Sequence, residues 1–449
     1  MPTNVDGTSG IMGALWLTTL ICILTVSRSD FSLLWGLYSI SFALYGLLVF
    51  RKKTVDLKFG LLLALVIRIL SFGFSPHLTD DYFRFIWDGM IMHQGINPMA
   101  HLPSYLMDHP ELAMPDPHLF SLLNSPDYYS VYPPVAQILF YIPYAINHLN
   151  IGGHIFFYKG IALAADTAVI FLLYLLLKKN NLPIHRLLIY ALNPLIIIEF
   201  AGNLHFEGVM IACLLSAVLF SEKRLIFLSS LFMTASIGTK LIPFMLIPFM
   251  PRQMFWKKWI LWGITTLSVT CLIFWFIYQN TGWLQSINLW FRSFEFNAGF
   301  YYVIRELDSM WRGYDNIHFV GPLMAGLTLM LILFIWIIYL KKQKWHWSAA
   351  MLFALTIYFL MTTTLHPWYL STILALSVIS GHYYPVIWTY LVFLSYSHYD
   401  QGGFSEKYIF ICVEYFILFG WMIFEYRFRL SPVPLAPPQS SFSARGKGI

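Results

Sequence analysis

The residues best suited to chemistry lie in the stretch 79–98, TDDYFRFIWDGMIMHQGINP. Asp80 and Asp81 are adjacent carboxylates that follow a long apolar segment, and Arg84 comes three residues after them. A carboxylate at a membrane surface can take a proton from a hydroxyl group and so act as a general base. Partial burial and a neighbouring like charge raise the pKa of such an acid and make it a better base. Because charge at a membrane edge is costly to maintain, this stretch is a candidate functional site.

The same residues also have ordinary structural interpretations. Thr79, Asp80 or Asp81 could cap the N-terminus of a helix that continues through FRFIWDG. Arg84 could form a local ion pair that orients one of the acids, or it could contact an anionic substrate. Asp88 with Gly89 and the later GINP could mark a helix end and a turn. Capping and catalysis are compatible, so both adjacent carboxylates stay candidates.

The composition indicates which scaffold must position these residues. Of the 449 residues, 58% are hydrophobic and 11% are charged. A soluble domain carries about 25% charged residues, and continuous apolar segments of roughly 17–22 residues are typical of transmembrane helices. The four cysteines lie in such segments without metal-ligand spacing, and the first segment lacks the basic start of a cleaved signal peptide. We therefore expect an all-α, multi-pass protein of the inner (plasma) membrane.

Hydropathy predicts one domain, residues 1–430, with about 12–14 transmembrane segments. Residues 132–150 are apolar but contain three prolines, so we interpret them as a re-entrant or interfacial segment. The Pro/Ser-rich residues 431–449 predict a disordered cytoplasmic tail. The predicted spans are 10–26, 31–50, 57–75, 155–177, 187–200, 207–221, 225–238, 240–250, 259–279, 319–340, 349–365, 367–381, 385–397 and 408–424.

The positions of Lys and Arg predict the orientation, because these residues concentrate on the cytoplasmic side. A basic cluster at 51–58 separates the second and third segments and should be cytoplasmic. The third helix then leads outward, and residues 76–131 form an extracytoplasmic loop with seven acidic residues and one arginine. Residues 280–318 become a second outer loop. The carboxylates of the first loop would therefore face away from cytoplasmic nucleotides.

Other residues on the predicted outer face could bind a substrate. Cations are scarce there, and a contact with a phosphate would explain each of them, although long side chains can also reach the membrane surface by snorkelling. His366, within TTTLHPWY, could share a proton or bind a phosphate oxygen. A polar group in EFAGNLHFEGV could bind sugar hydroxyls or tie off helix ends. These candidates are Lys240, Arg292, Arg305, His366, Asn203, His205 and Glu207.

Several chemistries lack support in the sequence. No Walker A, G-x-G-x-x-G or H-E-x-x-H motif occurs, and no basic–aromatic pattern suggests nucleic-acid binding. The outer face offers carboxylates, histidine, aromatic residues and a few cations. That set suits a sugar together with a lipid phosphate.

Several motifs resemble those of the GT-C class of integral-membrane glycosyltransferases. The likeness is greatest to the bacterial mannosyltransferase-like members of that class. TDDYFRFIWDG, GINP and VYPPVAQILF carry the first part of the likeness. EFAGNLHFEGVM, TKLIPFMLIP, FNAGFYYVIREL and LHPWYL follow in the expected order, so the likeness extends over about residues 57–375. Two predicted spans precede the helix before the first loop, whereas many GT-C enzymes have none there.

The resemblance implies a GT-C-like helical bundle and a reaction. The donor would be a polyprenyl-phosphate hexose, most often mannose, and the acceptor a lipid or a glycan. Asp81 would be the general base, with Asp80 assisting or binding the acceptor, and the anomeric configuration would be inverted. Lys240, Arg292, Arg305 or His366 would stabilise the departing lipid phosphate, and Arg84, His205 and Glu207 would also lie at the substrate site. The resemblance implies no metal and no other cofactor.

Two other classes of protein are compatible with the sequence. A transporter or flippase of a lipid-linked sugar would have inverted repeats and paired charges near the bilayer midplane. Arg68 and Asp166 are the main charged residues within predicted spans, and no repeat is evident. A non-catalytic assembly partner would tolerate the loss of Asp80 and Asp81.

Overall fold

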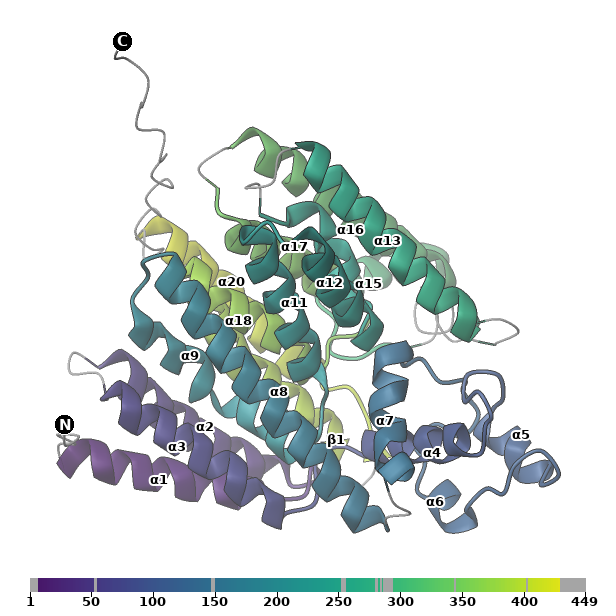
Figure 1. Ribbon diagram of the computed structural model, residues 1–449. Helices are drawn as coiled ribbons and strands as arrows, with labels where there is room; N and C mark the ends of the chain where they lie inside the picture. The colour runs from purple at the N-terminus through teal and green to yellow at the C-terminus, as the bar shows by residue number, and fades with distance from the viewer. Residues whose placement is uncertain are drawn as a thin grey trace.

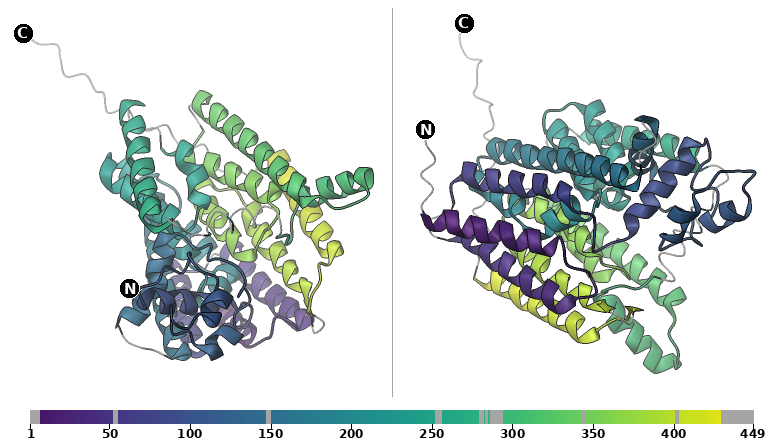
Figure 2. Two further views of the ribbon diagram at one scale, coloured as in Figure 1. Left: turned by 90° about the vertical axis from the view of Figure 1, so that its right-hand side faces the viewer. Right: turned by 90° about the horizontal axis from the view of Figure 1, so that it is seen from below.

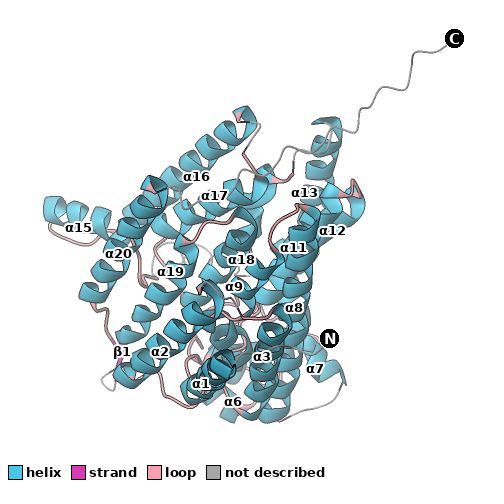
Figure 3. Ribbon diagram, turned by 90° about the vertical axis from the view of Figure 1, so that its left-hand side faces the viewer, coloured by secondary structure: helices cyan, strands magenta, loops and turns pink. Residues whose placement is uncertain are grey.

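The computed structural model describes residues 7–51, 55–146, 150–251, 256–278, 282, 285, 294–342, 345–400 and 403–428. Helices account for almost all of its regular structure, which confirms the predicted all-α fold (Figures 1 and 3). The predicted tail and residues 280–281, 283–284 and 286–293 of the second outer loop lie outside the described residues. Two short strands, β1 (Tyr399–Asp400) and β2 (Gly403–Phe404), pair antiparallel as a small hairpin.

The α-helices follow one another with few long connections. They are α1 (Gly7–Ile23), α2 (Phe31–Phe50), α3 (Leu57–Leu70), α4 (Asp81–His93), α5 (Pro103–Asp108), α6 (Pro117–Ser121), α7 (Pro134–Ile146), α8 (Ile151–Lys179), α9 (Leu187–Ala191), α10 (Pro194–Ile196), α11 (Glu207–Glu222), α12 (Ile226–Thr239), α13 (Trp256–Tyr278), α15 (Phe300–Arg312), α16 (Ile317–Lys341), α17 (Trp347–Met361), α18 (Ser371–Ser380), α19 (Tyr384–Leu391) and α20 (Tyr408–Arg427). Shorter helical turns are the 3₁₀ segments Ser71–Gly73, Ile184–Arg186, Ile242–Phe249, Pro367–Leu370 and Val392–His398, and the π-helical turn Ile197–Gly202.

Five of the described helices are long and apolar enough to cross a membrane: α2, α8, the greater part of α13, α16 and α20. A sixth span is possible if the pair 184–191 and 194–202, bent by 51°, is counted as one. Other apolar helices have only 10–17 residues. Proline explains several of the breaks, since it removes a backbone donor and disfavours a helical residue before it. The chain is therefore a polytopic helical membrane protein, and the predicted count of 12–14 spans stays a prediction.

The predicted re-entrant segment 132–150 forms α7, a helix of 13 residues. At 1.5 Å per residue it is about 20 Å long, which is shorter than a hydrocarbon core of roughly 30 Å. It packs against α4 and α12. This length agrees with the interpretation as a non-spanning segment, and its depth in the membrane stays a prediction.

Buried apolar side chains form two separate cores. The larger core joins α1–α3 to the long helices of the bundle. The smaller core lies between α4, α7 and the start of α8, where the Phe85 and Phe140 rings stack 4.5 Å apart. Figures 1 and 2 show this region, α4 to α7, at one end of the bundle. The helix that carries the adjacent carboxylates thus has its own packed support.

The N-terminal hairpin of α1 and α2 is part of the bundle. The Tyr38 hydroxyl donates a 2.6 Å hydrogen bond to the Thr389 carbonyl, and the Tyr45 hydroxyl donates one of 2.8 Å to the Ile189 carbonyl. All four of these residues are buried or nearly so. Polar bonds of this kind within an apolar core fix the hairpin against α9 and α19.

The charged residues predicted within spans form a buried ion pair between α3 and α8. Arg68 Nε lies 2.5 Å from Asp166 Oδ2, and both side chains are 2% exposed. Arg68 Nη1 also donates to the carbonyls of Ala64 and Ala191. These bonds compensate the desolvation of the guanidinium and give the pair a structural explanation.

Candidate active site

Helix α4 begins directly at the adjacent carboxylates. Thr79 Oγ1 accepts a 3.2 Å hydrogen bond from the Asp81 amide, whereas the side chain of Asp80 makes no capping bond. Of the three predicted capping residues, Thr79 is thus the one whose side chain bonds a helix amide. Asp81 is the first residue of α4, where the helix dipole favours a negative charge. Both carboxylates remain partly exposed.

Asp81 lies among groups from three other parts of the chain. Asn124 Nδ2 donates a 3.0 Å hydrogen bond to Asp81 Oδ1. Burial raises the pKa of Asp81 above its ordinary value, the Asn124 bond and the positive charge of Lys240 lower it, and Asp80 and Glu207 raise it. Burial has the largest effect. A carboxylate with a raised pKa and partial access to solvent suits proton abstraction near neutral pH.

Asp80 has a different environment from Asp81. Arg28 Nη2, on the link between α1 and α2, lies 2.5 Å from Asp80 Oδ2. The same guanidinium lies over the Tyr399 ring, 5.0 Å from its centre. Sequence reasoning did not select Arg28, although its position between the first two predicted spans places it on the predicted outer face. The pair separates the roles of the two acids, because Asp80 has a cation partner within 4 Å and Asp81 has none among the described residues.

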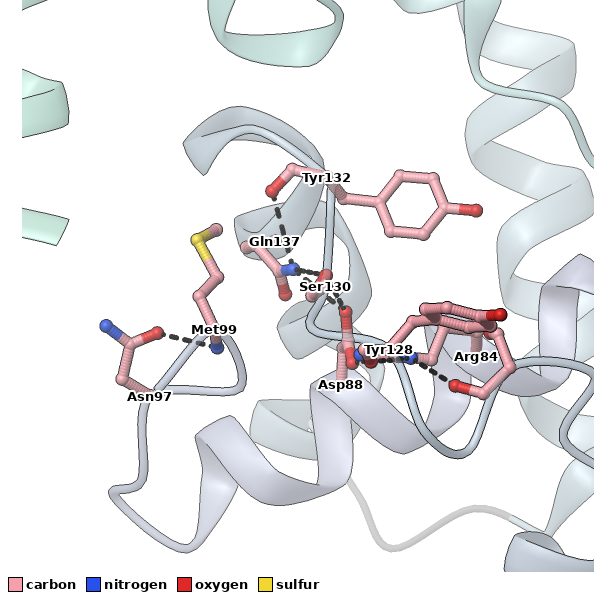
Figure 4. Close-up of polar contacts among 9 residues, drawn as sticks. Arg84, Asp88, Asn97, Met99, Tyr128, Ser130, Tyr132 and Gln137 are labelled. Carbon is pink, nitrogen blue, oxygen red and sulfur yellow. Dashed lines mark hydrogen bonds and ion pairs between the residues drawn. The ribbon is translucent and has the colours of Figure 1, made fainter. Parts of the chain in front are cut away.

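Arg84 pairs with Asp88 and not with either candidate acid. Arg84 Nε lies 2.8 Å from Asp88 Oδ1, and Arg84 Nη1 donates 3.0 Å bonds to the carbonyls of Ser125 and Tyr128. Figure 4 shows the side chain reaching from α4 to the backbone at Tyr128. Arg84 is 4% exposed and Asp88 is fully buried. Arg84 therefore forms a local ion pair, but with Asp88 four residues later, and the predicted pair with Asp80 or Asp81 is absent from the described contacts.

Asp88 also ties α4 to α7. The Ser130 hydroxyl donates a 2.5 Å bond and Gln137 Nε2 a 2.9 Å bond to Asp88 Oδ2, and Gln137 Nε2 lies 2.7 Å from Ser130 Oγ (Figure 4). Asp88 lies within α4, which ends at His93, so the helix end lies just before GINP and not at Asp88. The buried Ser130 and Gln137 donors satisfy the Asp88 carboxylate within the helix, so the helix can continue past this residue. This network fixes the start of α4 relative to the loop that precedes α7.

Lys240 and Glu207 form an ion pair beside Asp81. Lys240 directly follows the end of α12, and Glu207 is the first residue of α11. The ammonium contacts the Glu207 carboxylate and lies 4.1 Å from the centre of the Tyr369 ring. The Lys240 side chain keeps 29% of its surface exposed, whereas that of Glu207 keeps 4%. A partly exposed cation next to a carboxylate base can stabilise negative charge on a substrate.

His205 packs flat against Trp368, with ring centres 3.6 Å apart. Its Nε2 lies 3.4 Å from Glu199 Oε2, and its amide donates a 3.0 Å bond to the Glu199 carbonyl. Asn203 and Tyr396 both donate to the Glu199 carboxylate, at 3.2 and 2.7 Å. The sequence alternative of polar residues that tie off a helix end thus holds for Asn203. Burial lowers the pKa of His205, so its imidazole is neutral at pH 7.

His366 lies between two aromatic rings. The Trp368 ring is parallel to it at 4.5 Å, and the Phe296 ring is stacked at 4.6 Å. Burial and the nearby Lys240 charge lower the pKa of His366 to about 3. A neutral imidazole can donate one hydrogen bond and accept another but contributes no formal charge.

The remaining predicted cations are placed differently. Arg305, on α15, pairs with Glu295 and with Glu306, and its Nη2 lies 3.0 Å from the Tyr408 hydroxyl. No described contact joins it to Asp81, so the structure does not bring it into the same cluster. Arg292 lies outside the described residues.

One cluster therefore collects most of the predicted site residues from distant parts of the sequence. It comprises Asp81, His205, Glu207, Lys240 and His366, with Asp80 at its edge. Among the described residues, no three His, Cys, Asp or Glu side chains are grouped so as to hold a metal ion. The prediction of metal-independent chemistry is not tested by that grouping and stays a prediction.

Comparison with known proteins supports the resemblance seen in the sequence. Residues 60–256 match the family model described as alpha-(1->6)-mannopyranosyltransferase, N-terminal domain. No curated protein gave a significant match. The matched residues run from α3 to the start of α13 and include Asp80, Asp81, Glu207 and Lys240. Together with the helical architecture, this match over residues 60–256 supports a mannosyltransferase-like multi-pass membrane protein.

Proposed function

We propose that this protein transfers mannose from a polyprenyl-phosphate donor to a hydroxyl group of a lipid or glycan acceptor at the extracytoplasmic face of the plasma membrane. The observation that carries the proposal is Asp81, a carboxylate with a raised pKa beside a partly exposed Lys240. The match to a mannosyltransferase family over residues 60–256 supports the sugar and the reaction class. The predicted orientation and the lack of nucleotide-binding motifs support a lipid-linked donor.

Asp81 acts as the general base in this reaction. Its carboxylate takes the proton of the acceptor hydroxyl as the hydroxyl oxygen attacks the anomeric carbon of the sugar. The bond between that carbon and the phosphate oxygen breaks, and its electron pair leaves with the lipid phosphate. A single displacement inverts the anomeric configuration. Such a base contributes typically about 10²–10⁴-fold to the rate.

The neighbouring residues stabilise the leaving group and hold the sugar. The Lys240 ammonium is close enough to influence Asp81 and so can lie beside the departing phosphate. His366 and His205 are neutral and offer hydrogen bonds without charge. Glu207 keeps Lys240 in place. Arg292 stays a candidate for the same role from the second predicted outer loop, whereas the bonds of Arg305 to Glu295 and Glu306 give it a structural role away from Asp81.

Arg84 supports the site from behind. Its bonds to Asp88 and to the backbone at Ser125 and Tyr128 leave it 4% exposed. A direct contact with substrate would require these bonds to break. We therefore assign Arg84 a positioning role that fixes the start of α4, in preference to the substrate contact that the sequence had suggested.

The test uses the full-length protein in proteoliposomes with synthetic polyprenyl-phosphate mannose and, separately, a nucleotide-linked mannose. We expect transfer to an acceptor glycolipid only from the polyprenyl-phosphate donor, and none in Asp81→Ala with equal protein in the membrane. Transfer from the nucleotide sugar alone would refute the donor class. Translocation of the lipid-linked sugar without transfer would instead favour the transporter alternative.

A further inference from the structure

We propose that Arg28, on the link between α1 and α2, binds the phosphate group of the lipid-linked donor by exchanging its ion pair with Asp80 for the phosphate. The inference rests on the proposed function, because it assumes a phosphate-bearing donor. It adds to the site a residue that lies outside the matched residues 60–256. The N-terminal hairpin would then be part of the substrate site as well as part of the fold.

Arg28 lies next to the proposed catalytic carboxylates. Its guanidinium bridges the hairpin of α1 and α2 to the start of α4 through the 2.5 Å contact with Asp80. Asp80 is adjacent to Asp81, so Arg28 contacts the residue next to the proposed base. The Tyr399 ring, 5.0 Å from the guanidinium carbon, supports it from the β1 strand. A guanidinium that lies over an aromatic ring keeps its N–H groups pointing outward in its own plane, where they are available to an acceptor.

Exposure distinguishes Arg28 from the arginines Arg84 and Arg305, whereas its bonding distinguishes it from Lys240. Its side chain is 34% exposed and that of its partner Asp80 is 39% exposed. Arg84, by contrast, is 4% exposed and holds one carboxylate and two carbonyls. Lys240 is held between Glu207 and the Tyr369 ring, and Arg305 is held by two carboxylates and a tyrosine hydroxyl.

The bonding of Arg28 leaves donors for a ligand. Among the described residues it makes a single ion pair, through Nη2 alone. Its Nη1 and Nε therefore have no protein acceptor in the described part of the chain. A guanidinium presents its donors as a fork that matches two oxygens of a phosphate. An exposed ion pair contributes little net free energy, so replacing Asp80 by a phosphate has a low cost.

The exchange would also affect the base. Asp80 already raises the pKa of Asp81 as a like charge. When Arg28 moves to the phosphate, the Asp80 charge loses its nearest counter-ion and acts more strongly on Asp81. Donor binding would in this way strengthen the proton affinity of Asp81 when an acceptor is about to be deprotonated.

The experiment measures binding of polyprenyl phosphate and of polyprenol to the full chain in lipid nanodiscs. We expect the wild type to prefer the phosphate, and Arg28→Gln to lose affinity for it by about ten-fold or more while its affinity for polyprenol is unchanged. Arg28→Lys should recover part of the loss. Asp80→Asn should bind polyprenyl phosphate as well as the wild type or better, because it releases Arg28.

A matched control is Arg312→Gln. Arg312 is also an exposed arginine, at 32%, paired with a carboxylate and near an aromatic ring, but it lies on α15. It should leave phosphate binding unchanged.

Two results would overturn the inference alone: wild-type binding in Arg28→Gln, or an equal loss in Arg28→Gln and Asp80→Asn, which would make Arg28 only a structural partner of Asp80. A wild type that binds polyprenyl phosphate no better than polyprenol would refute the proposed donor as well.

Discussion

The hydrogen bond from Asn124 to Asp81 offers a way to change the pKa of the proposed base without replacing the base itself. The 3.0 Å hydrogen bond from Asn124 Nδ2 to Asp81 Oδ1 lowers the pKa of Asp81, and Asn124→Ala removes this bond. Without it, burial and the neighbouring carboxylates raise that pKa further. Because the base works only when it is deprotonated, its contribution is lost as the pH falls through its pKa. The acid limb of the pH–rate profile should therefore move to higher pH in Asn124→Ala.

The size of this shift follows from the environment of the bond. Asn124 is exposed to solvent, so water partly replaces its hydrogen bond when the side chain is removed. A net hydrogen-bond contribution of about 0.5–1.5 kcal/mol corresponds to roughly 0.4–1.1 pH units. We expect the midpoint of the acid limb to rise by about half a unit to one unit. The rate on the alkaline plateau should stay near the wild-type rate, since Asp81 itself is intact.

The assay is kcat/KM for mannosyl transfer in proteoliposomes across the acid range, because kcat/KM reports groups of the free enzyme. Gln94→Ala is the matched control. Gln94 belongs to the same region but bonds the Met114 backbone and not Asp81. It should leave the acid limb in place. An acid limb that stays put, or moves to lower pH, in Asn124→Ala would refute the assignment of this limb to Asp81.

Two further predictions test the support and the orientation of the site. Gly89→Ala should loosen the contact of α4 with α7, because the added Cβ would lie 2.2 Å from the Phe140 carbonyl oxygen. Overpacking costs about 1–3 kcal/mol, so the Tm in detergent should fall. An unchanged Tm would contradict the close packing. In a chain without its native cysteines, Met114→Cys, at an 84% exposed position, should react with an impermeant maleimide on intact cells. Lys178→Cys should react only after permeabilisation, and the opposite pattern would reverse the predicted orientation.

Much of the helical framework could be predicted because hydropathy is a local property. The predicted segment 31–50 is α2 residue for residue, and 408–424 differs from α20 only at its C-terminal end. A long apolar helix can be recognised from its own residues, without knowledge of the helices it packs against. The interruptions are less predictable: the predicted span 187–200 is bent by 51° where Asn193 precedes Pro194 and a π-helical turn follows.

The polar partners could be predicted less well, because they depend on the tertiary fold. Helical spacing allowed Arg84 to pair with an acid on either side, and buried bonds from Ser130 and Gln137 hold its partner Asp88 in place. Arg28 and Asp80 are separated by 52 positions, and no pattern in the sequence links them. Lys240 and Glu207 were each candidates, but their pairing became evident only when α11 and α12 were placed side by side.

The most direct test of the account is the single-turnover rate of mannosyl transfer in Asp81→Asn, measured with polyprenyl-phosphate mannose already bound. Asparagine keeps the size of the side chain and can still contact Asn124, but it cannot accept the proton of the acceptor. We predict a fall of about 10²–10⁴-fold in the transfer rate with donor affinity changed by only a few-fold. Transfer at the wild-type rate in Asp81→Asn would contradict the central claim that Asp81 is the general base.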